Sequence, residues 1–389
     1  MAGRMLLLLS LLAASGASGA EPLSEAARLG SLLFSDPALS ASGRVSCASC
    51  HDPANAYAAP PGAAVVMSGG ATLDQSGLRT VPSLRYLDGT PRFARHYFSV
   101  RSGEREDRGP VGGFMRDGRA DSLRGQAMLP LLDPKEMANA DVGAVAMRLR
   151  AAGYLAQLGQ VYGEAALQSD AAVAAAAVDA IASFELEDPG FHPYSSRYDQ
   201  FLAGRAQLSP RELRGLRLFV DPAKGNCSEC HPHDAAPGAG GPAFTDFSYH
   251  ALGVPRNPAI AANRDLKFFD LGLCGPLRHD LGAERDYCGF FKTPTLRNVG
   301  RRKFLFHNGR FTSLSEAVRF YVERDRRPGL WYPRRAGAPI RFDDMPAELR
   351  GNVNRSDAPL NWRRGQRPAL DAAEIDDLVA FLRTLDDAQ

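Results

Sequence analysis

Apolar residues recur at helical spacing in two distant stretches of the chain, and the two stretches resemble each other. The recurring positions are Ala26, Leu29 and Leu33 in the first stretch and Leu213, Leu216 and Phe219 in the second. Spacing by three or four residues predicts an amphipathic helix in each case. Each stretch leads into a similar string, FSDPA at 34–38 and FVDPA at 219–223. The chain therefore contains an internal repeat.

Each half of the chain also ends in a predicted amphipathic helix, over 178–186 and over 375–385. Ser209, Pro210 and Glu212 form a capping box with proline at the first helical position, so a helix is expected to begin there. The stretch 187–207 holds two prolines, two glycines and several aromatic residues, which is typical of a linker. We therefore expect a domain over 21–190, a linker over 191–207 and a domain over 208–389.

Few stretches show the alternation of apolar and polar residues that is typical of β-strands, and these are short. The pattern therefore predicts a mainly α fold with long irregular loops. A length of 389 residues favours two domains over one. The net charge of +2 indicates no nucleic-acid partner.

The first residues have the pattern of a secretory signal. Arg4 precedes the apolar run 5–12, and small residues end at Ala20, where we expect cleavage. A membrane anchor is the alternative, but so short a run does not cross a hydrocarbon core of about 30 Å. We expect a periplasmic protein whose mature form has no membrane span.

Two Cys-x-x-Cys-His motifs carry the clearest chemistry. The first consists of Cys47, Cys50 and His51, and the second of Cys227, Cys230 and His231. Two thiols at this spacing can bind both vinyl groups of a haem, and the histidine then ligates the iron. A zinc site would need two more ligands at matching spacing, and a redox dithiol would need a βαβ context. The motifs predict two covalently bound c-type haems.

The remaining cysteines are Cys274 and Cys288, which enclose 13 residues. In an oxidising compartment they are expected to form a disulfide worth about 3 kcal/mol, with two free core cysteines as the alternative.

At this point the sequence resembles the bacterial di-haem cytochrome c peroxidases, and in particular their MauG-like branch. The strings that carry the resemblance, besides both haem motifs, are DGRADSL at 117–123, Gln126, Pro130, Glu136-Met137, FKTPTLRNV at 291–299 and HNGR at 307–310. The resemblance implies two cytochrome-c-like domains, in which the N-terminal haem reacts with hydrogen peroxide and the C-terminal haem stores or passes electrons. The expected partners are a small redox protein, either a cytochrome c or a cupredoxin, or an oxidisable protein substrate. A homodimer is also possible.

The resemblance places Gln126, Pro130 and Glu136 in the distal pocket of the first haem, with Glu136 as the acid–base group. Leu123, Gln126 and Pro130 fall on one face of a short predicted helix that Pro130 helps to end. A solvated glutamate in a turn is the alternative for Glu136.

The first iron is expected to keep an open sixth position. Classical family members have a blocking histidine soon after the first motif, whereas the next histidine here is His96, expected to be an ordinary loop residue. Met67 is a conceivable weak ligand, with a core or loop methionine as the alternative reading.

The second iron needs a sixth protein ligand, and Tyr321 lies where MauG-like proteins supply a tyrosine. No methionine occurs between Met147 and Met345. Ser313 and Glu316 are expected to cap a helix whose inner face is formed by Leu314, Ala317, Val318 and Tyr321. A core tyrosine hydrogen-bonded elsewhere is the alternative. A phenolate ligand would favour ferric iron, and so favours oxidation of a protein over simple peroxide removal.

The chain departs from the family at two places. Arg116 stands where the family has a tryptophan between the haems. Thr80, Arg302 and Phe304 occupy the positions of the family's calcium ligands, so calcium is possible but disfavoured, and Arg302 could supply the positive charge instead.

Two further histidines, His233 and His250, are expected to be loop residues, with His233 close enough to the second motif to reach a haem propionate. The competing functions are a peroxide-dependent oxidoreductase, a di-haem electron carrier without peroxide chemistry, and a haem sensor. A carrier would not need a proton-transfer group such as Glu136.

Overall fold

The computed structural model describes residues 22–101, 104–235, 240–363 and 365–388, and the observations that follow concern these residues. The predicted signal peptide, residues 1–20, lies outside them. Within the described ranges, the model contains no helix with the length and apolar character needed to cross a membrane.

The described chain is mainly helical, as the sequence predicts. Its α-helices are α1 (Glu25–Ser35), α2 (Cys47–Cys50), α3 (Leu123–Leu132), α4 (Val142–Ala151), α5 (Leu155–Tyr162), α6 (Asp170–Glu187), α7 (Arg197–Leu202), α8 (Pro210–Val220), α9 (Leu314–Glu323) and α10 (Ala372–Leu382). Long loops and short 3-10 turns connect them.

The strands form four antiparallel pairs of very short elements. They are β1 (Ser68–Gly69) with β2 (Gln75–Ser76), β3 (Phe98–Arg101) with β4 (Glu104–Asp107), β5 (Tyr249–His250) with β6 (Phe291–Lys292), and β7 (Arg334–Arg335) with β8 (Ala338–Pro339). None is long enough to form a core sheet.

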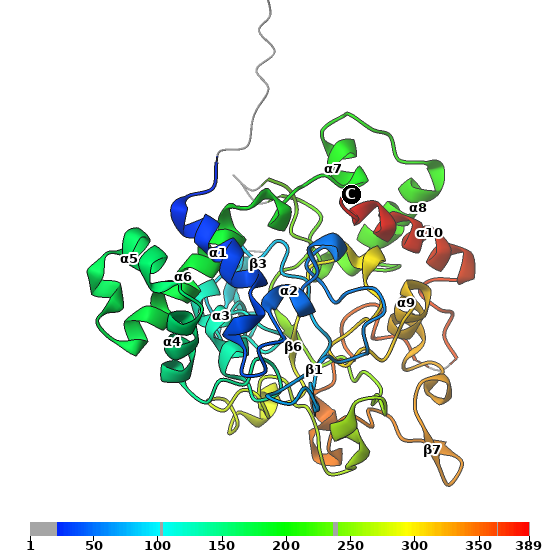
Figure 1. The fold of residues 1–389 in the computed structure, drawn as a ribbon. Helices are drawn as coiled ribbons and strands as arrows, with labels where there is room; N and C mark the ends of the chain where they lie inside the picture. The colour runs from blue at the N-terminus through cyan, green and yellow to red at the C-terminus, as the bar shows by residue number, and fades with distance from the viewer. Residues whose placement is uncertain (1–21, 102–103, 236–239, 364, 389) are drawn as a thin grey trace, which may run out of the picture.

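The internal repeat appears as two equivalent helix pairs, α1 on α6 and α8 on α10 (Figure 1). Each pair crosses at a glycine. A Cβ atom on Gly30 would lie 1.9 Å from the carbonyl oxygen of Ala180, and one on Gly215 would lie 2.1 Å from that of Asp377. Only glycine allows the two backbones to approach so closely. The same packing solution is therefore used in both halves.

Each helix pair has its own hydrophobic core. One core is built from buried residues between 29 and 191, and the other from buried residues between 198 and 385. The stretch predicted as a linker contains α7, whose Tyr198 packs in the second core and whose Asp199 pairs with Arg297 at 2.8 Å. The linker stretch is thus anchored to the second half, and the division of the chain at this point remains a prediction.

Several local predictions are confirmed and two are wrong. Ser209 and Glu212 form the predicted capping box of α8, and Cys274 and Cys288 form the predicted disulfide. Pro130 does not end α3, which continues to Leu132 because a proline near the end of a helix removes only one hydrogen bond. Ser313 precedes α9, but its side chain makes no capping hydrogen bond.

Candidate functional site

In the described part of the chain, each of the two cysteine–histidine motifs lies at a cavity of its own. The first cavity is lined by Cys50 and His51, with Cys47 one turn earlier in α2. The second cavity is lined by Cys227, Cys230 and His231. The two cavities have similar volumes, about 210 and 220 Å³.

The two motif histidines are held in the same way. His51 Nδ1 lies 3.0 Å from the carbonyl oxygen of Tyr57, and His231 Nδ1 lies 2.8 Å from that of Phe244. A carbonyl oxygen only accepts, so Nδ1 carries the proton in both rings. Burial lowers the pKa of both imidazoles, that of His51 to about 4, so each ring is neutral. Each Nε2 therefore keeps a lone pair for iron, as a proximal haem ligand requires.

The first cavity brings together the three residues predicted for a peroxide pocket. Gln126 and Pro130 lie on α3, Glu136 lies in the turn that follows, and all three line the cavity wall. Gln126 is buried, and its Oε1 atom has no hydrogen-bond partner among the described residues. A buried amide oxygen without a partner is costly, which indicates a place for a polar ligand.

The Glu136 carboxyl has an unusual pKa for its type. It forms part of the cavity wall, and its side chain is accessible from the cavity. Burial, followed by the negative charge of Asp133, raises its pKa to about 7, while Arg119 opposes the shift. A carboxyl that gains and loses a proton near neutral pH is suited to proton transfer.

The second cavity is closed by α9. Leu314, Ala317, Val318 and Tyr321 all line it, as the helical spacing predicts. Burial, followed by the nearby Cys230 and Cys227 thiols, raises the pKa of Tyr321. No hydrogen bond joins the Tyr321 hydroxyl to another described residue, and the side chain lines the second cavity.

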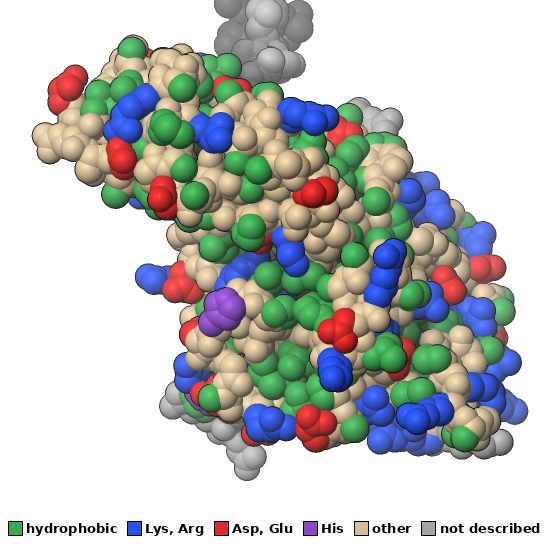
Figure 2. Space-filling model, turned by 60° about the horizontal axis from the view of Figure 1, so that its bottom comes forward, with side chains coloured by type: hydrophobic (Ala, Val, Ile, Leu, Met, Phe, Trp, Pro, Cys, Tyr) green, Lys and Arg blue, Asp and Glu red, His purple; other side chains and the backbone are tan. Residues whose placement is uncertain are grey.

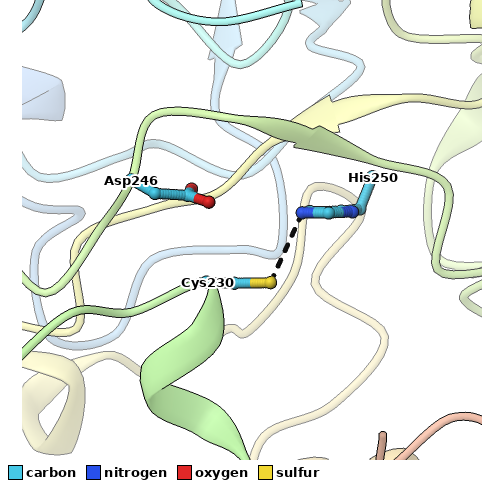
Figure 3. Close-up of side chains that lie close together, drawn as sticks. All are labelled: Cys230, Asp246 and His250. Carbon is cyan, nitrogen blue, oxygen red and sulfur yellow. Dashed lines mark hydrogen bonds between the residues drawn. The ribbon is translucent and has the colours of Figure 1, made fainter. Parts of the chain in front are cut away.

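His250 is not the loop residue that the sequence suggests, because it lies in β5 and lines the second cavity. Figure 3 shows its ring facing the Cys230 thiol beside Asp246, with Nε2 3.4 Å from the sulfur. These three side chains are close enough to share a metal ion. Cys230, however, belongs to the second Cys-x-x-Cys-His motif, which predicts haem attachment, and a thioether sulfur would not be a thiolate ligand. The cluster therefore belongs to the second cavity.

The two cavities share a wall. Residues that line both are Arg116, Lys292, Thr293, Pro294, Thr295 and Arg302. The sequence reading assigned no role to Lys292, although it lies inside the string 291–299. Positive charge thus gathers between the cavities, where the propionate carboxylates of two haems would need it. The free Nε2 atoms, the thiol pairs and these cations fit a haem in each cavity.

The other residues considered from the sequence lie around this framework. Met67 lines the first cavity. His96 is an exposed loop residue whose Nδ1 lies 2.7 Å from Asp107 Oδ2. His233 is a partly exposed loop residue that lies 3.8 Å from Asp234.

Comparison with known proteins agrees with this geometry. Residues 24–207 match the family model described as di-haem cytochrome c peroxidase. The methylamine utilization protein MauG of Paracoccus denitrificans is 35% identical over 382 residues, which cover 96% of this chain and 92% of that protein. The chain belongs to the di-haem cytochrome c peroxidase family.

Two further members of the family extend the comparison. The cytochrome c551 peroxidase of Nitrosomonas europaea is 30% identical over 75% of this chain and 71% of its own length. The crystal structure of the diheme peroxidase BthA from Burkholderia thailandensis is 39% identical, covers 95% of this chain and 87% of its own, and superposes with a TM-score of 0.83. This di-haem peroxidase relative thus has the same fold over nearly the whole chain. The prediction of an oxidoreductase of the peroxidase type is confirmed, and family membership implies two haem c groups.

Proposed function

We propose that this protein is a periplasmic, MauG-like peroxidase that reacts with hydrogen peroxide at the N-terminal haem and takes electrons through the C-terminal haem. The electrons come from a small redox protein, a cytochrome c or a cupredoxin, or from an oxidisable protein substrate. Each half is a cytochrome-c-like haem domain, which the equivalent helix pairs support. Periplasmic placement rests on the predicted signal peptide and the disulfide.

The observation that carries the proposal is the wall of the first cavity. Glu136, Gln126 and Pro130 converge there, and none of them lines the second cavity. A di-haem carrier needs neither a proton-transfer group nor an open coordination position, so this wall favours the enzyme.

When bound in the first cavity, the haem supplies an iron that accepts peroxide and takes part in its two-electron reduction. The Glu136 carboxylate would take the proton from the inner peroxide oxygen and return it to the outer oxygen, which then leaves as water. Gln126 Oε1, which has no partner of its own, can accept a hydrogen bond from the peroxide or from protonated Glu136. Pro130 has no N–H group and forms an apolar part of the wall.

In the second cavity, His231 and Tyr321 would both hold the haem iron. The Tyr321 hydroxyl has no other hydrogen-bond partner among the described residues, and it lies near both thiols of the motif. A haem with protein ligands on both sides does not bind peroxide, which leaves electron transfer as its role.

An arginine cluster beside the second cavity points to an acidic electron donor. Arg341, Arg355 and Arg363 converge on the buried Asp325 carboxylate, which Arg324 also holds at 2.6 Å. Arg363 also donates to the carbonyl oxygen of Leu360, which lines the second cavity. Lys and Arg side chains gather along the lower right edge of the face in Figure 2. Arg324 is buried and balances the Asp325 charge, so the three partly exposed arginines leave net positive charge at the surface, which favours a negatively charged partner.

Stopped-flow spectroscopy tests the proposal. Ferric protein mixed with hydrogen peroxide is expected to form a defined spectral species within seconds, followed through the Soret band. Slow, featureless bleaching would instead identify an electron carrier and contradict the proposal. A second mixing step with an acidic cytochrome or cupredoxin then tests the donor, since steering by the arginine cluster makes the reaction slower at high ionic strength.

A further inference from the structure

The strongest unexplained feature is the positive charge in the wall between the two cavities. Arg116, Arg302 and Lys292 each line both cavities. Burial, followed by the charges of Arg302 and Arg79, lowers the pKa of Arg116, while the Asp270 carboxylate opposes the shift.

The nearby carboxylates are already paired with other cations. Arg79 binds Asp270 through two hydrogen bonds of 2.7 and 2.8 Å and binds Asp117 at 2.7 Å. Arg119 donates to both oxygens of Asp117 at 2.9 Å. Asp117 is completely buried, and Arg79 and Arg119 both donate to its carboxylate, so these two cations balance its charge.

The three cations have neutral hydrogen-bond partners or none. The Arg116 guanidinium donates to Thr80 Oγ1 at 2.6 Å and to the Thr80 carbonyl oxygen at 3.2 Å. Lys292 Nζ donates to the carbonyl oxygen of Gly113. The Arg302 side chain makes no hydrogen bond or ion pair with any described residue. Burial lowers the pKa of Arg302 to about 10 and that of Lys292 to about 7. Asp270 favours the charged form of Arg116, and Asp117 favours that of Lys292. Both carboxylates are hydrogen-bonded to Arg79, so they balance the three half-buried cations only in part, and a further anion is favourable beside them.

The same contacts leave no suitable place for a divalent cation. Both oxygen atoms of Thr80, a residue of this wall, accept hydrogen bonds from Arg116. Calcium requires several free oxygen ligands, and two guanidinium groups at this place would repel it.

We propose that Arg116, Arg302 and Lys292 form an anion site between the two cavities, which binds haem propionates from both sides and takes the place of a bound divalent cation. The inference rests on the two haems and does not depend on the reaction with peroxide. Guanidinium groups keep their charge at all relevant pH values and cannot be removed by a chelator. The positive charge of the two arginines between the haem sites is therefore present without a bound metal ion and persists in the presence of a chelator.

Because Arg302 lines both cavities, one substitution at this residue is expected to change the redox properties of both haems. Positive charge near a haem favours the reduced iron. Arg302→Gln is therefore expected to move the midpoint potentials of both haems to more negative values. Arg302→Lys keeps the charge and is expected to retain most of the wild-type potentials. Lys303→Gln, which removes an exposed neighbouring charge, is the matched control and should leave both potentials unchanged.

The potentials are measured by spectroelectrochemical titration of the full di-haem protein without peroxide. The Arg302 side chain forms no hydrogen bond or ion pair within the described part of the chain, and haem content with circular dichroism checks that each variant is intact. Unchanged potentials in an intact Arg302→Gln variant would overturn the proposal. Elemental analysis of wild-type protein provides an independent measurement. Stoichiometric calcium, with a shift of either potential on chelation, would also overturn it.

Discussion

The two cavities are built on the same local scaffold but have different walls. In both, a helix–helix pair crosses at a glycine, a Cys-x-x-Cys-His motif follows, and the histidine donates its Nδ1 proton to a backbone carbonyl. The first cavity is then bordered by α3 and Glu136, and the second by α9 and Tyr321. Under the proposed function, the shared scaffold would position the cofactor, and the bordering segment would decide whether the site reacts with peroxide or transfers electrons.

The equivalent helices also differ in one buried side chain. The glycine crossings align Ala180 with Asp377 and Phe184 with Phe381, so Glu185 in α6 corresponds to Leu382 in α10. Glu185 is buried, and its Oε2 atom has no hydrogen-bond partner among the described residues. Burial alone raises the pKa of Glu185 to about 8. The first half therefore contains an ionisable group where the second half has an apolar one.

Glu136→Gln should have the largest effect on the difference between the cavities. Glutamine keeps the shape of the side chain but cannot accept the peroxide proton. The rate of the first reaction with peroxide is expected to fall by about 10²–10⁴-fold, measured in stopped-flow mixing. Glu187→Gln, a carboxylate of α6 outside the cavity, is the control. An unchanged rate in Glu136→Gln would show that the first cavity does not use this carboxyl.

Tyr321→Phe should make the second cavity behave like the first. Loss of the phenolic oxygen leaves the second iron without its sixth ligand, so an added ligand can bind there. Cyanide titration followed by absorption is expected to give a stoichiometry of two per chain in the variant and one in the wild type. Tyr332→Phe removes a buried hydroxyl that donates to Gly253 and lies outside the cavity, so it should keep the stoichiometry of one. A stoichiometry of one in both variants would contradict ligation by Tyr321.

Glu185→Leu should make the two helix pairs more alike and change how stability depends on pH. The Glu185 pKa is raised from 4.5 in the unfolded chain to about 8 in the folded protein. Between these values the folded state keeps a proton that the unfolded state has lost. This residue therefore makes the free energy of unfolding decrease as pH rises, by roughly 1.4 kcal/mol per pH unit. The leucine variant is expected to lose this slope and to gain most stability above pH 8.

Urea unfolding at several pH values measures this slope, as the difference between variant and wild type. Glu185→Gln is a useful companion, because it removes the charge and retains the buried polar group. It should remove the slope as well but gain less stability at high pH than the leucine variant. Parallel pH profiles for wild type and Glu185→Leu would mean that Glu185 does not titrate in this window.

Asp133→Asn should have the smallest effect, which is a lower pKa of the Glu136 carboxyl. Asp133 is the second cause of the raised Glu136 pKa, after burial, so loss of its charge lowers that pKa. The peroxide reaction needs the carboxylate form, and its rate is expected to rise with pH through about 7 in the wild type. The rise should move to lower pH in Asp133→Asn and stay in place in Asp121→Asn, a surface variant. A pH–rate profile of the first step measures the shift, and an unmoved profile in Asp133→Asn would refute the coupling.

The local scaffold could be predicted from the sequence because it depends on short-range patterns. Helical spacing, the Ser209 capping box and the two cysteine–histidine motifs all act within a few residues of chain. The boundaries were less certain, since Pro130 lies inside α3 and Ser313 makes no capping bond. The disulfide was predicted correctly because the chain contains only two cysteines outside the haem motifs.

The tertiary structure decided which residues that are distant in the sequence come into contact. Arg79 and Asp270 are 191 positions apart, yet they form one buried ion pair, and Thr80 meets the Arg116 guanidinium. Likewise, His250 turns out to face Cys230, and Glu185 turns out to be buried without a partner. Charge pairing and desolvation depend on distance in space, and a sequence determines that distance only once the whole chain has folded. The sequence alone determined that there are two haem sites, and the fold decided how they differ and what lies between them.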